Sequence, residues 1–327
     1  MVAKKKSRIV KKAVPKPKDA GVYIDPRTDF GFKRLFGEKD LMIAFLNSVL
    51  DVKDGIVDLE YRNTVRTGVS KDERETIFDL YCSTGTGEQI IVEMQTIPHE
   101  HFIDRVVYYV SRLIQQQGKK SKDWDYQLPP IYSVNIVDFK LDKERVEDKY
   151  LSYIQLLDRD TKELLYDKLT LLFLELPRFK KDEDELETDV DKWLFTLKNL
   201  PKLNKTPKKL GSKVFRKLFE LAKIAKMTAE QQNDYYKSLH DMNIVKIQFG
   251  KMESTIAQQS KTIAVLTHDI SALTHDNTAL THDISALQKE NEELRRRLGL
   301  SGTTDTKPTR TTKVRVRNNV KAREAAN

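Results

Sequence analysis

The stretch TIFDLYCSTGTGEQIIVEMQ, residues 76–95, is the part of this 327-residue chain that decides its fold. It contains two runs rich in β-branched and aromatic residues, 76–83 and 89–95, which are separated by a turn with two glycines. Such runs around a turn predict a β-hairpin. Each run carries one carboxylate, Asp79 or Glu93, between neighbours that are apolar on both faces. Because two apolar faces are typical of a strand inside a sheet, we expect this hairpin to lie in the interior of one.

The turn also predicts the register of the hairpin. Gly85 and Gly87 lie symmetrically about Thr86, and Asp79 and Glu93 are each seven positions from Thr86. The two acids are therefore expected opposite each other, with Cβ atoms roughly 4.5–5.5 Å apart. Carboxylates so close repel each other, and a divalent cation such as Mg²⁺, which prefers oxygen ligands and retains waters, relieves that repulsion. The alternative is an ordinary amphipathic hairpin whose acids face solvent, and a register shifted by one residue would separate the acids.

Outward from the hairpin, helix and strand patterns alternate. On the upstream side, Asp29 is expected to cap a short helix, and a second helix is expected over residues 39–50. The remaining predicted elements are strands at 56–67, 131–139, 153–157 and 169–176, a helix at 101–117 and a helix around Trp193. This order predicts an α/β fold, with a mixed sheet flanked by helices.

A heptad repeat follows over residues 251–298. Isoleucine or asparagine at the first core position alternates with leucine at the second, which favours a parallel two-stranded coiled coil with its register fixed by the buried asparagines. The predicted oligomerisation positions are Ile263, Leu266, Ile270, Leu273, Asn277, Leu280, Ile284, Leu287, Asn291 and Leu294. The three histidines His268, His275 and His282 fall at the outermost heptad position, where a seven-residue spacing cannot close a metal chelate.

The net charge of +9 is unevenly distributed. Residues 1–20 contain eight Lys and Arg against one acid, and residues 301–327 contain seven against two, so the part between them has a net charge of −3. We expect disordered basic tails at 1–21 and 299–327, because neither has apolar periodicity. Such tails can bind phosphate backbones through counterion release, and the alternative is that they only solubilise the chain.

Composition also restricts the compartment. A single cysteine, Cys82, excludes an intramolecular disulfide framework and suits a reducing environment. The strongly apolar runs are much shorter than the roughly 20 residues that span a bilayer. The basic N-terminal residues are not followed by an apolar segment, unlike those of a secretory signal. These features predict a cytoplasmic protein that does not bind membranes.

Three sequence features together resemble a known family. They are Asp79 followed by the Glu-Xaa-Gln of residues 93–95, the segment TDFGFKRLFG at 28–37, and the segment LTLLFLELPRF at 169–179. In this order they resemble the PD-(D/E)XK nuclease superfamily, and within it the Rpn-type recombination-promoting nucleases, a branch also described as transposases. The resemblance covers about residues 22–250.

The resemblance implies a restriction-endonuclease-like core at 22–140, with a strand extension and helical part of the same domain at 141–250. It implies a metal-dependent DNA endonuclease that cleaves phosphodiester bonds in recombination or mobile-element processes. A parallel dimer formed through 251–298 would hold two nuclease domains together. The alternatives are a catalytically inactive DNA-binding or assembly protein that keeps the nuclease fold, and a purely structural coiled-coil adaptor.

The resemblance also suggests roles for single residues. Asp79 and Glu93 match the acids that hold Mg²⁺ (or Mn²⁺), and Asp29 matches an acid contributed by the first helical region. Gln95 stands where many relatives carry a lysine, and it would orient the attacking water or donate to the phosphate. Phe78 occupies the position of the proline in the family's name.

Three basic residues are candidates for contact with DNA. Lys33 belongs to the TDFGFKRLFG segment, and Arg105 and Arg112 belong to the helix expected after Gln95. Tyr108 shares a helix face with Arg112, since the two are one turn apart. On this helix we expect either a face directed at phosphate or a buried tyrosine beside an exposed arginine.

Overall fold

The computed structural model describes residues 21–63, 65–66, 76–118, 125–142 and 149–300. The chain divides after Glu253 into two units, which are described one at a time. The basic tails expected at 1–21 and 299–327 lie outside the described residues, except for residue 21 and residues 299–300.

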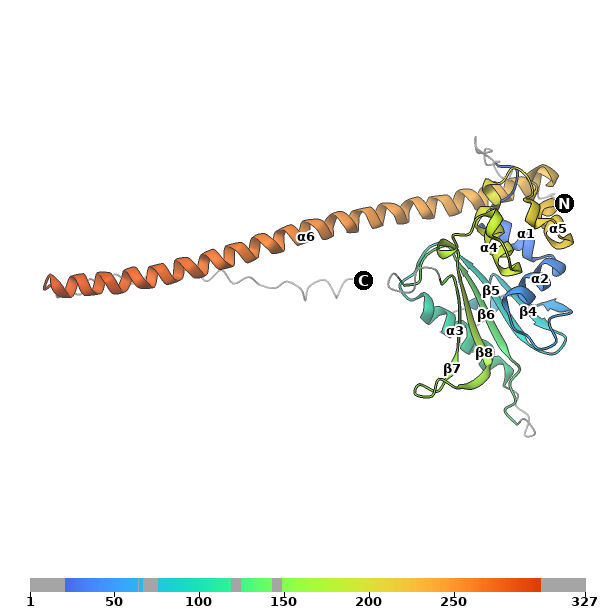
Figure 1. Ribbon diagram of the computed structural model, residues 1–327, viewed down its shortest axis with the longest axis horizontal. Coiled ribbons are helices and arrows are strands. Elements are labelled where there is room, and N and C mark those ends of the chain that lie inside the picture. The colour runs from blue at the N-terminus through green and yellow to red at the C-terminus, as the bar shows by residue number, and fades with distance from the viewer. Residues whose placement is uncertain (1–20, 64, 67–75, 119–124, 143–148, 301–327) are drawn as a thin grey trace, which may run out of the picture. The chain divides into compact units, whose positions relative to one another are not determined.

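A six-stranded mixed sheet forms the centre of the first unit (Figure 1). Its strand order is β1-β4-β5-β6-β8-β7, in which β5, β6 and β8 run parallel and the other neighbours are antiparallel. The strands are β1 (Leu59–Tyr61), β4 (Leu80–Thr84), β5 (Gln89–Gln95), β6 (Ile131–Val137), β7 (Leu151–Leu157) and β8 (Leu164–Glu175). The predicted mixed α/β fold is confirmed, and β5 is an interior strand.

Helices cover both faces of this sheet. One face packs against α1, α2, α4 and α5, and the other packs against α3, so two hydrophobic cores lie on either side of the strands. The helices of this unit are α1 (Asp29–Phe36), α2 (Lys39–Val49), α3 (Phe102–Gln117), α4 (Asp189–Asn199), α5 (Lys213–Ala222) and the first part of α6 (Ala229–Arg297). Short 3-10 helices occupy Leu176–Arg178, Glu183–Glu185, Leu200–Lys202, Lys208–Leu210 and Ile224–Lys226.

Aromatic packing fixes the position of α1, which carries part of the candidate site. The buried indole of Trp193 on α4 lies 5.8 Å from the ring of Phe36 on α1, measured between centroids. The same indole lies 5.4 Å from the ring of Phe45 on α2 and 5.0 Å from that of Phe215 on α5. Because aromatic pairs add to the free energy of burial, this cluster joins four helices into one rigid support.

The start of α1 differs from the prediction. Thr28 is the N-cap, since its Oγ1 accepts a hydrogen bond from the Gly31 amide at 3.0 Å, and Asp29 is the first helical residue. An acid in the first turn still interacts favourably with the helix dipole. Gly31 is required by a close approach, because a Cβ atom there would lie 2.1 Å from the Asp25 carbonyl oxygen. The TDFG sequence therefore holds Asp29 at a fixed helix start.

Two predicted strands are each divided in the structure. The run at 56–67 gives β1 and the two-residue strand β2 (Val65–Arg66), and its last residue lies outside the described ranges. The run at 76–83 gives β3 (Thr76–Ile77), which pairs with β2 in a separate ladder, and then β4. Asp79 forms the bend before β4, and its side chain bonds to the backbone of β5, which interrupts regular strand pairing at this residue.

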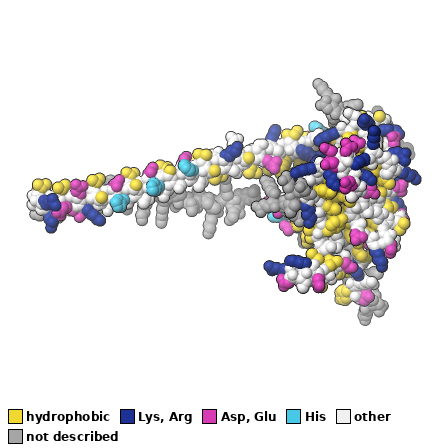
Figure 2. Space-filling model, in the orientation of Figure 1, with side chains coloured by type: hydrophobic (Ala, Val, Ile, Leu, Met, Phe, Trp, Pro, Cys, Tyr) yellow, Lys and Arg dark blue, Asp and Glu magenta, His cyan; other side chains and the backbone are white. Residues whose placement is uncertain are grey.

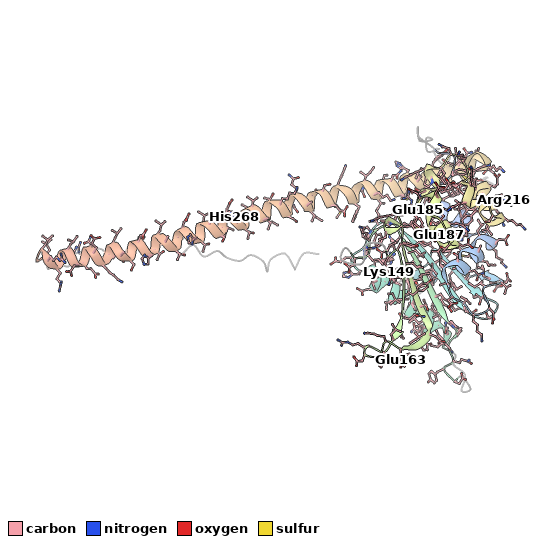
Figure 3. All side chains as sticks on the ribbon, viewed as in Figure 1. Lys149, Glu163, Glu185, Glu187, Arg216 and His268 are labelled. Atoms are coloured by element: carbon pink, nitrogen blue, oxygen red, sulfur yellow. The ribbon has the colours of Figure 1, made fainter. Side chains whose placement is uncertain are left out.

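The second unit contains the C-terminal part of α6, which is one continuous helix of 69 residues. Its apolar heptad positions are 50–65% exposed in the single chain, so no described residue covers this stripe. His268 projects into solvent (Figure 3), and histidines and charges are spread along the helix surface (Figure 2). The helix over 251–297 is observed, and its coiled-coil pairing stays a prediction. None of the helices in the described ranges is long and apolar enough to cross a membrane.

Candidate active site

The hairpin of β4 and β5 has the predicted register. Leu80 pairs with Val92 and Ser83 pairs with Gln89, so the strands are centred on Thr86. Asp79 and Glu93 come next in this register, and each carboxylate bonds to the opposite segment. The Met94 amide donates to Oδ2 of Asp79 at 2.9 Å, and the Asp79 amide donates to Oε1 of Glu93 at 3.2 Å.

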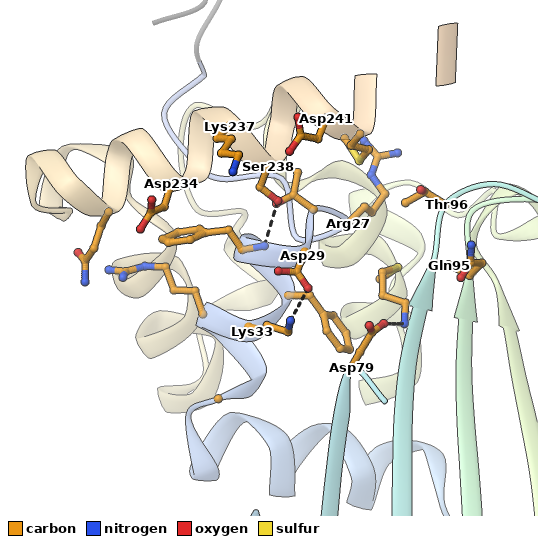
Figure 4. A pocket seen from close by; sticks show the side chains of 18 of the residues that line it. Arg27, Asp29, Lys33, Asp79, Gln95, Thr96, Asp234, Lys237, Ser238 and Asp241 are labelled. Carbon is orange, nitrogen blue, oxygen red and sulfur yellow. Dashed lines mark hydrogen bonds and ion pairs between the residues drawn. The ribbon is translucent and has the colours of Figure 1, made fainter. Parts of the chain in front are cut away.

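Asp79 lies on the wall of an open pocket of about 870 Å³ (Figure 4). Asp29 and Lys33 of α1 line the same pocket and form an ion pair at 2.6 Å. Gln95, the last residue of β5, lines it as well, and Glu93 lies behind, 7% exposed. The fold therefore brings together Asp29, Asp79, Glu93, Gln95 and Lys33, which the sequence spreads over 67 positions.

Burial makes the two hairpin acids difficult to ionise. It raises the pKa of Glu93 to about 8, and the neighbouring charge of Asp79 adds to this effect. Burial also raises the pKa of Asp79, and the charge of Asp29 contributes in the same direction. The hydrogen bonds from backbone amides and the charges of Lys33 and Arg105 lower both pKa values, but they do not offset burial. Deprotonating this pair therefore costs folding free energy.

The sign of this cost predicts how stability depends on pH. An acid with a raised pKa in the folded state binds more protons folded than unfolded, so stability falls as pH rises from about 4.3 toward the folded value, at most roughly 1.4 kcal/mol per pH unit. For Glu93, whose pKa is raised to about 8, the window is about pH 4.3–8.

Glu93→Gln cannot ionise, and it should gain stability over the wild type progressively across this window. Denaturant unfolding of both proteins in EDTA at pH 5, 6, 7 and 8 measures the difference, and a difference that does not vary with pH would contradict the assignment.

The donor set of the pair fits a hydrated divalent cation. Hydrogen bonds occupy Oδ2 of Asp79 and Oε1 of Glu93, and the other oxygen of each has no hydrogen bond to a described residue. Across the described ranges, no group of three or more His, Cys, Asp or Glu side chains is arranged around a metal position. Two carboxylates with one available oxygen each suit an ion that keeps several waters, as Mg²⁺ does. A bound cation would also relieve the repulsion between them.

Gln95 and Arg105 form one polar contact at the end of β5. The Arg105 Nη2 of α3 donates to Oε1 of Gln95 at 2.7 Å. The Gln95 amide nitrogen donates to the Ile97 carbonyl oxygen at 3.3 Å. The carbonyl oxygen expected to orient water is therefore engaged by a guanidinium, which is half-buried and within electrostatic reach of both carboxylates.

The position of Arg112 on α3 contradicts its prediction as a DNA contact. Its side chain is 5% exposed, and its Nη1 donates to Oε1 of Gln115 at 2.9 Å, so the guanidinium is not presented to DNA. Tyr108, in contrast, is 40% exposed. Arg112 therefore points inward and Tyr108 outward, which is the reverse of the alternative with a buried tyrosine and an exposed arginine. The reason is that Val106, Val110 and Leu113 define the face of α3 that packs on the sheet.

Two features of the site were missed by the sequence analysis. The start of α6 forms a wall of the pocket through Lys237, Ser238 and Asp241, and Ser238 accepts a hydrogen bond from the Phe30 amide at 3.1 Å (Figure 4). Asn135 of β6 pairs in register with Glu93, and its buried Oδ1 has no hydrogen-bond partner among the described residues. The apolar residues on both sides of Asn135 indicate a buried strand, and a polar amide in such a strand is the sequence feature that could have identified this residue.

The pocket wall is tied to the rest of the domain by ion pairs. Arg27 bonds to Asp25 at 2.8 Å and to Asp138, after β6, at 3.1 Å. Lys246 of α6 reaches the same oxygen of Asp138 at 2.8 Å, and the Tyr235 hydroxyl accepts a hydrogen bond from the Asp25 amide at 3.0 Å. These contacts join α6, the segment before α1 and the end of β6 around the pocket.

Comparison with known proteins identifies a family. A family model described as PD-(D/E)XK nuclease family transposase matches residues 26–248. The matched range contains the whole sheet and every residue of the pocket, and it ends within α6 before the heptad repeat. Neither the curated proteins nor the solved structures give a significant match.

Proposed function

The chain belongs to the PD-(D/E)XK nuclease family transposases, and from this premise we propose that it is a metal-dependent DNA endonuclease acting at the Asp79–Glu93 hairpin. The mixed sheet with helices on both faces is consistent with the fold of that family. The observation that carries the proposal is a buried acid, Glu93, beside a half-buried acid, Asp79, both with raised pKa values at an open pocket. Perturbed acids in a cleft are a frequent property of catalytic sites.

The proposed reaction is hydrolysis of a phosphodiester. One water adds across a P–O bond, which leaves a phosphate monoester at one end and a hydroxyl at the other, and a proton is released. Mg²⁺ (or Mn²⁺) held by Asp79 and Glu93 would supply positive charge at the phosphate and lower the pKa of the attacking water. Within the chain, the amides of Met94 and Asp79 orient the two carboxylates. Asp29, on the same pocket wall, adds negative charge that favours cation binding.

Lys33 is proposed to contact the DNA backbone at the pocket entrance. Its ion pair with Asp29 is solvent-exposed, with side chains 51% and 66% accessible. Exposed pairs of this kind contribute less than about 1 kcal/mol, so a phosphate can replace Asp29 as the partner of Lys33 at little cost. The folded part of the chain is slightly acidic, and the basic tails are proposed to add non-specific affinity.

The proposed activity can be tested on supercoiled plasmid DNA. Purified full-length protein should convert it to nicked and linear forms in Mg²⁺ or Mn²⁺, and EDTA should stop the conversion until excess Mg²⁺ is restored. Metal removal has this effect because the carboxylates cannot supply positive charge themselves. Cleavage that continues in EDTA would rule out the metal-dependent site.

A catalytically inactive DNA-binding protein with the same fold is the second candidate. The neutral Gln95 favours it, because this position brings no cation of its own to the acids. Its signature would be retardation of the plasmid in a gel without conversion to nicked or linear DNA in either metal. Gel retardation and cleavage assays on the same samples separate the two candidates.

The heptad repeat is proposed to pair two chains in parallel. The exposed apolar stripe on α6 supports this, because a long apolar stripe that is open to solvent in the single chain is typical of a surface that binds a protein partner. Two nuclease domains held by one coiled coil would be available to cut both DNA strands.

A further inference from the structure

Arg105 is held in one orientation by three neighbours. Its Nη2 donates to Gln95 at 2.7 Å, and its guanidinium carbon lies 5.3 Å from the ring centroid of Phe102 and 5.8 Å from that of Tyr109. A cation within about 6 Å of an aromatic face is attracted by the ring quadrupole. A half-buried arginine restrained in this way is preorganised, and it has lost much of its side-chain entropy before any ligand binds.

The same contacts define what Gln95 does. Its carbonyl oxygen accepts from Arg105, and its amide nitrogen donates to Ile97, so the amide bridges α3 and the segment after β5. Gln95 thereby fixes the guanidinium at the carboxyl end of β5, two residues beyond Glu93. Its carbonyl lone pairs are directed at a donor of the protein, which makes it a positioning residue.

Two cations lie near the acids, and Arg105 has the larger influence of the two on Glu93, while Lys33 has the larger influence on Asp79 and lines the pocket. Arg105 and Lys33 both lower the pKa values of Asp79 and Glu93, so both lie within electrostatic reach. Lys33 is exposed and paired with Asp29. The side-chain hydrogen bonds of Arg105 to the described residues use Nη2 alone, which leaves Nε, Nη1 and the second hydrogen of Nη2 for a ligand. Guanidinium groups match the geometry of phosphate oxygens.

We propose that Arg105 contacts the phosphate undergoing cleavage and stabilises the charge that develops on it, and that Gln95 positions Arg105 for this contact. The inference rests on the proposed nuclease function and adds two roles to it. Position 95 on β5 carries no cationic side chain, and Arg105 on α3 then supplies the positive charge instead. Fixed donors aimed at developing charge are among the largest contributions to enzyme catalysis.

The test measures single-turnover plasmid cleavage and DNA affinity in EDTA for full-length variants. Arg105→Gln should lower the cleavage rate by about 100-fold, as the loss of one transition-state donor does, with DNA affinity changed less than about threefold. Arg105→Lys, which keeps the charge but loses the fork geometry, should lose roughly tenfold. Arg216→Gln removes one exposed positive charge from α5 and serves as the matched control, with the wild-type rate expected.

A double-variant cycle separates positioning from a structural role. Gln95→Met has a similar size, and its thioether is a much weaker acceptor than the amide oxygen, so it should slow cleavage by roughly tenfold. If Gln95 acts through Arg105, the double variant Gln95→Met/Arg105→Gln should be no slower than Arg105→Gln alone. Unfolding curves for each variant establish that the compared proteins are folded, and Arg105→Lys provides the comparison if Arg105→Gln is unstable.

Three outcomes would overturn the inference. They are a wild-type cleavage rate in Arg105→Gln, multiplicative losses in the double variant, and a loss of DNA affinity in EDTA as large as the loss of rate. Each requires an active wild type, and in that case the proposed nuclease function stands while the role of Arg105 falls. A wild type that cleaves no DNA in Mg²⁺ or Mn²⁺ overturns both.

Discussion

Asp79→Asn and Glu93→Gln are each expected to lower plasmid cleavage at least about 100-fold. Each change replaces a carboxylate of the pair by a neutral amide of the same shape, so the hydrogen bonds from the Met94 and Asp79 amides are retained while half of the anionic donor set is lost. A 100-fold loss corresponds to about 2.7 kcal/mol of transition-state stabilisation, which is modest for a group that would hold the catalytic cation. The measurement is the initial rate of plasmid nicking in Mg²⁺.

Stability measurements distinguish this loss from misfolding. Because ionisation of Asp79 and Glu93 opposes folding, both variants should unfold at a higher denaturant concentration than the wild type in EDTA at pH 8. The wild type should be stabilised by added Mg²⁺, and the variants much less, since a ligand stabilises only the state that binds it. Glu60→Gln, at an exposed carboxylate on β1 of the same sheet, is the matched control and should keep wild-type cleavage. Full activity in either site variant would contradict the assignment.

Lysine substitutions in the heptad core are expected to convert a dimer into monomers. The triple change Leu266→Lys, Leu273→Lys and Leu280→Lys removes three apolar side chains per helix, which are 54–61% exposed in the single chain. Six buried leucines per dimer contribute roughly 9 kcal/mol or more at about 1.5 kcal/mol each, which is most of the free energy of a nanomolar complex. Light scattering should therefore give twice the chain mass of 38.0 kDa for the wild type and the single chain mass for the variant.

The histidines of the same heptads provide a charge-matched control. His268→Lys, His275→Lys and His282→Lys add the same three lysines at the outermost position, so the dimer mass should be unchanged. A wild type that is already monomeric, or a core variant that stays dimeric, would contradict the coiled coil. If pairing serves cleavage of both strands, the monomeric variant should accumulate nicked circles and form less linear plasmid.

The hairpin shows how far local sequence can predict a site. The symmetric glycines about Thr86 predicted the register of the two strands, and the structure shows that register. The helices over residues 39–49 and 102–117 were also predicted, because their apolar residues recur at helical spacing on one face. Each of these predictions depends on residues close together in the chain, for which periodicity and turn chemistry are sufficient.

Other features depend on contacts between distant segments, which periodicity does not contain. Arg112 was assigned to the DNA surface, but the direction of its helix face is decided by the sheet on which α3 packs. The wall formed by Lys237 and Ser238 depends on a contact across more than 200 residues, from Ser238 to Phe30. The bend at Asp79 follows from its bond to the Met94 amide, which only the folded hairpin can form.

The turn between β4 and β5 also restricts how this gene can change. Its outer residues are held together because the Thr84 amide donates to the Glu88 carbonyl oxygen and the Glu88 amide donates to Oγ1 of Thr84, and Gly87 has a φ of 102°, which favours glycine. Point substitutions at Gly85 or Thr86 leave the spacing of the strands intact. An inserted or deleted codon shifts one strand by a residue and moves Asp79 to the opposite face from Glu93. Length variation in descendants of this sequence should therefore accumulate in other connections and spare residues 84–88.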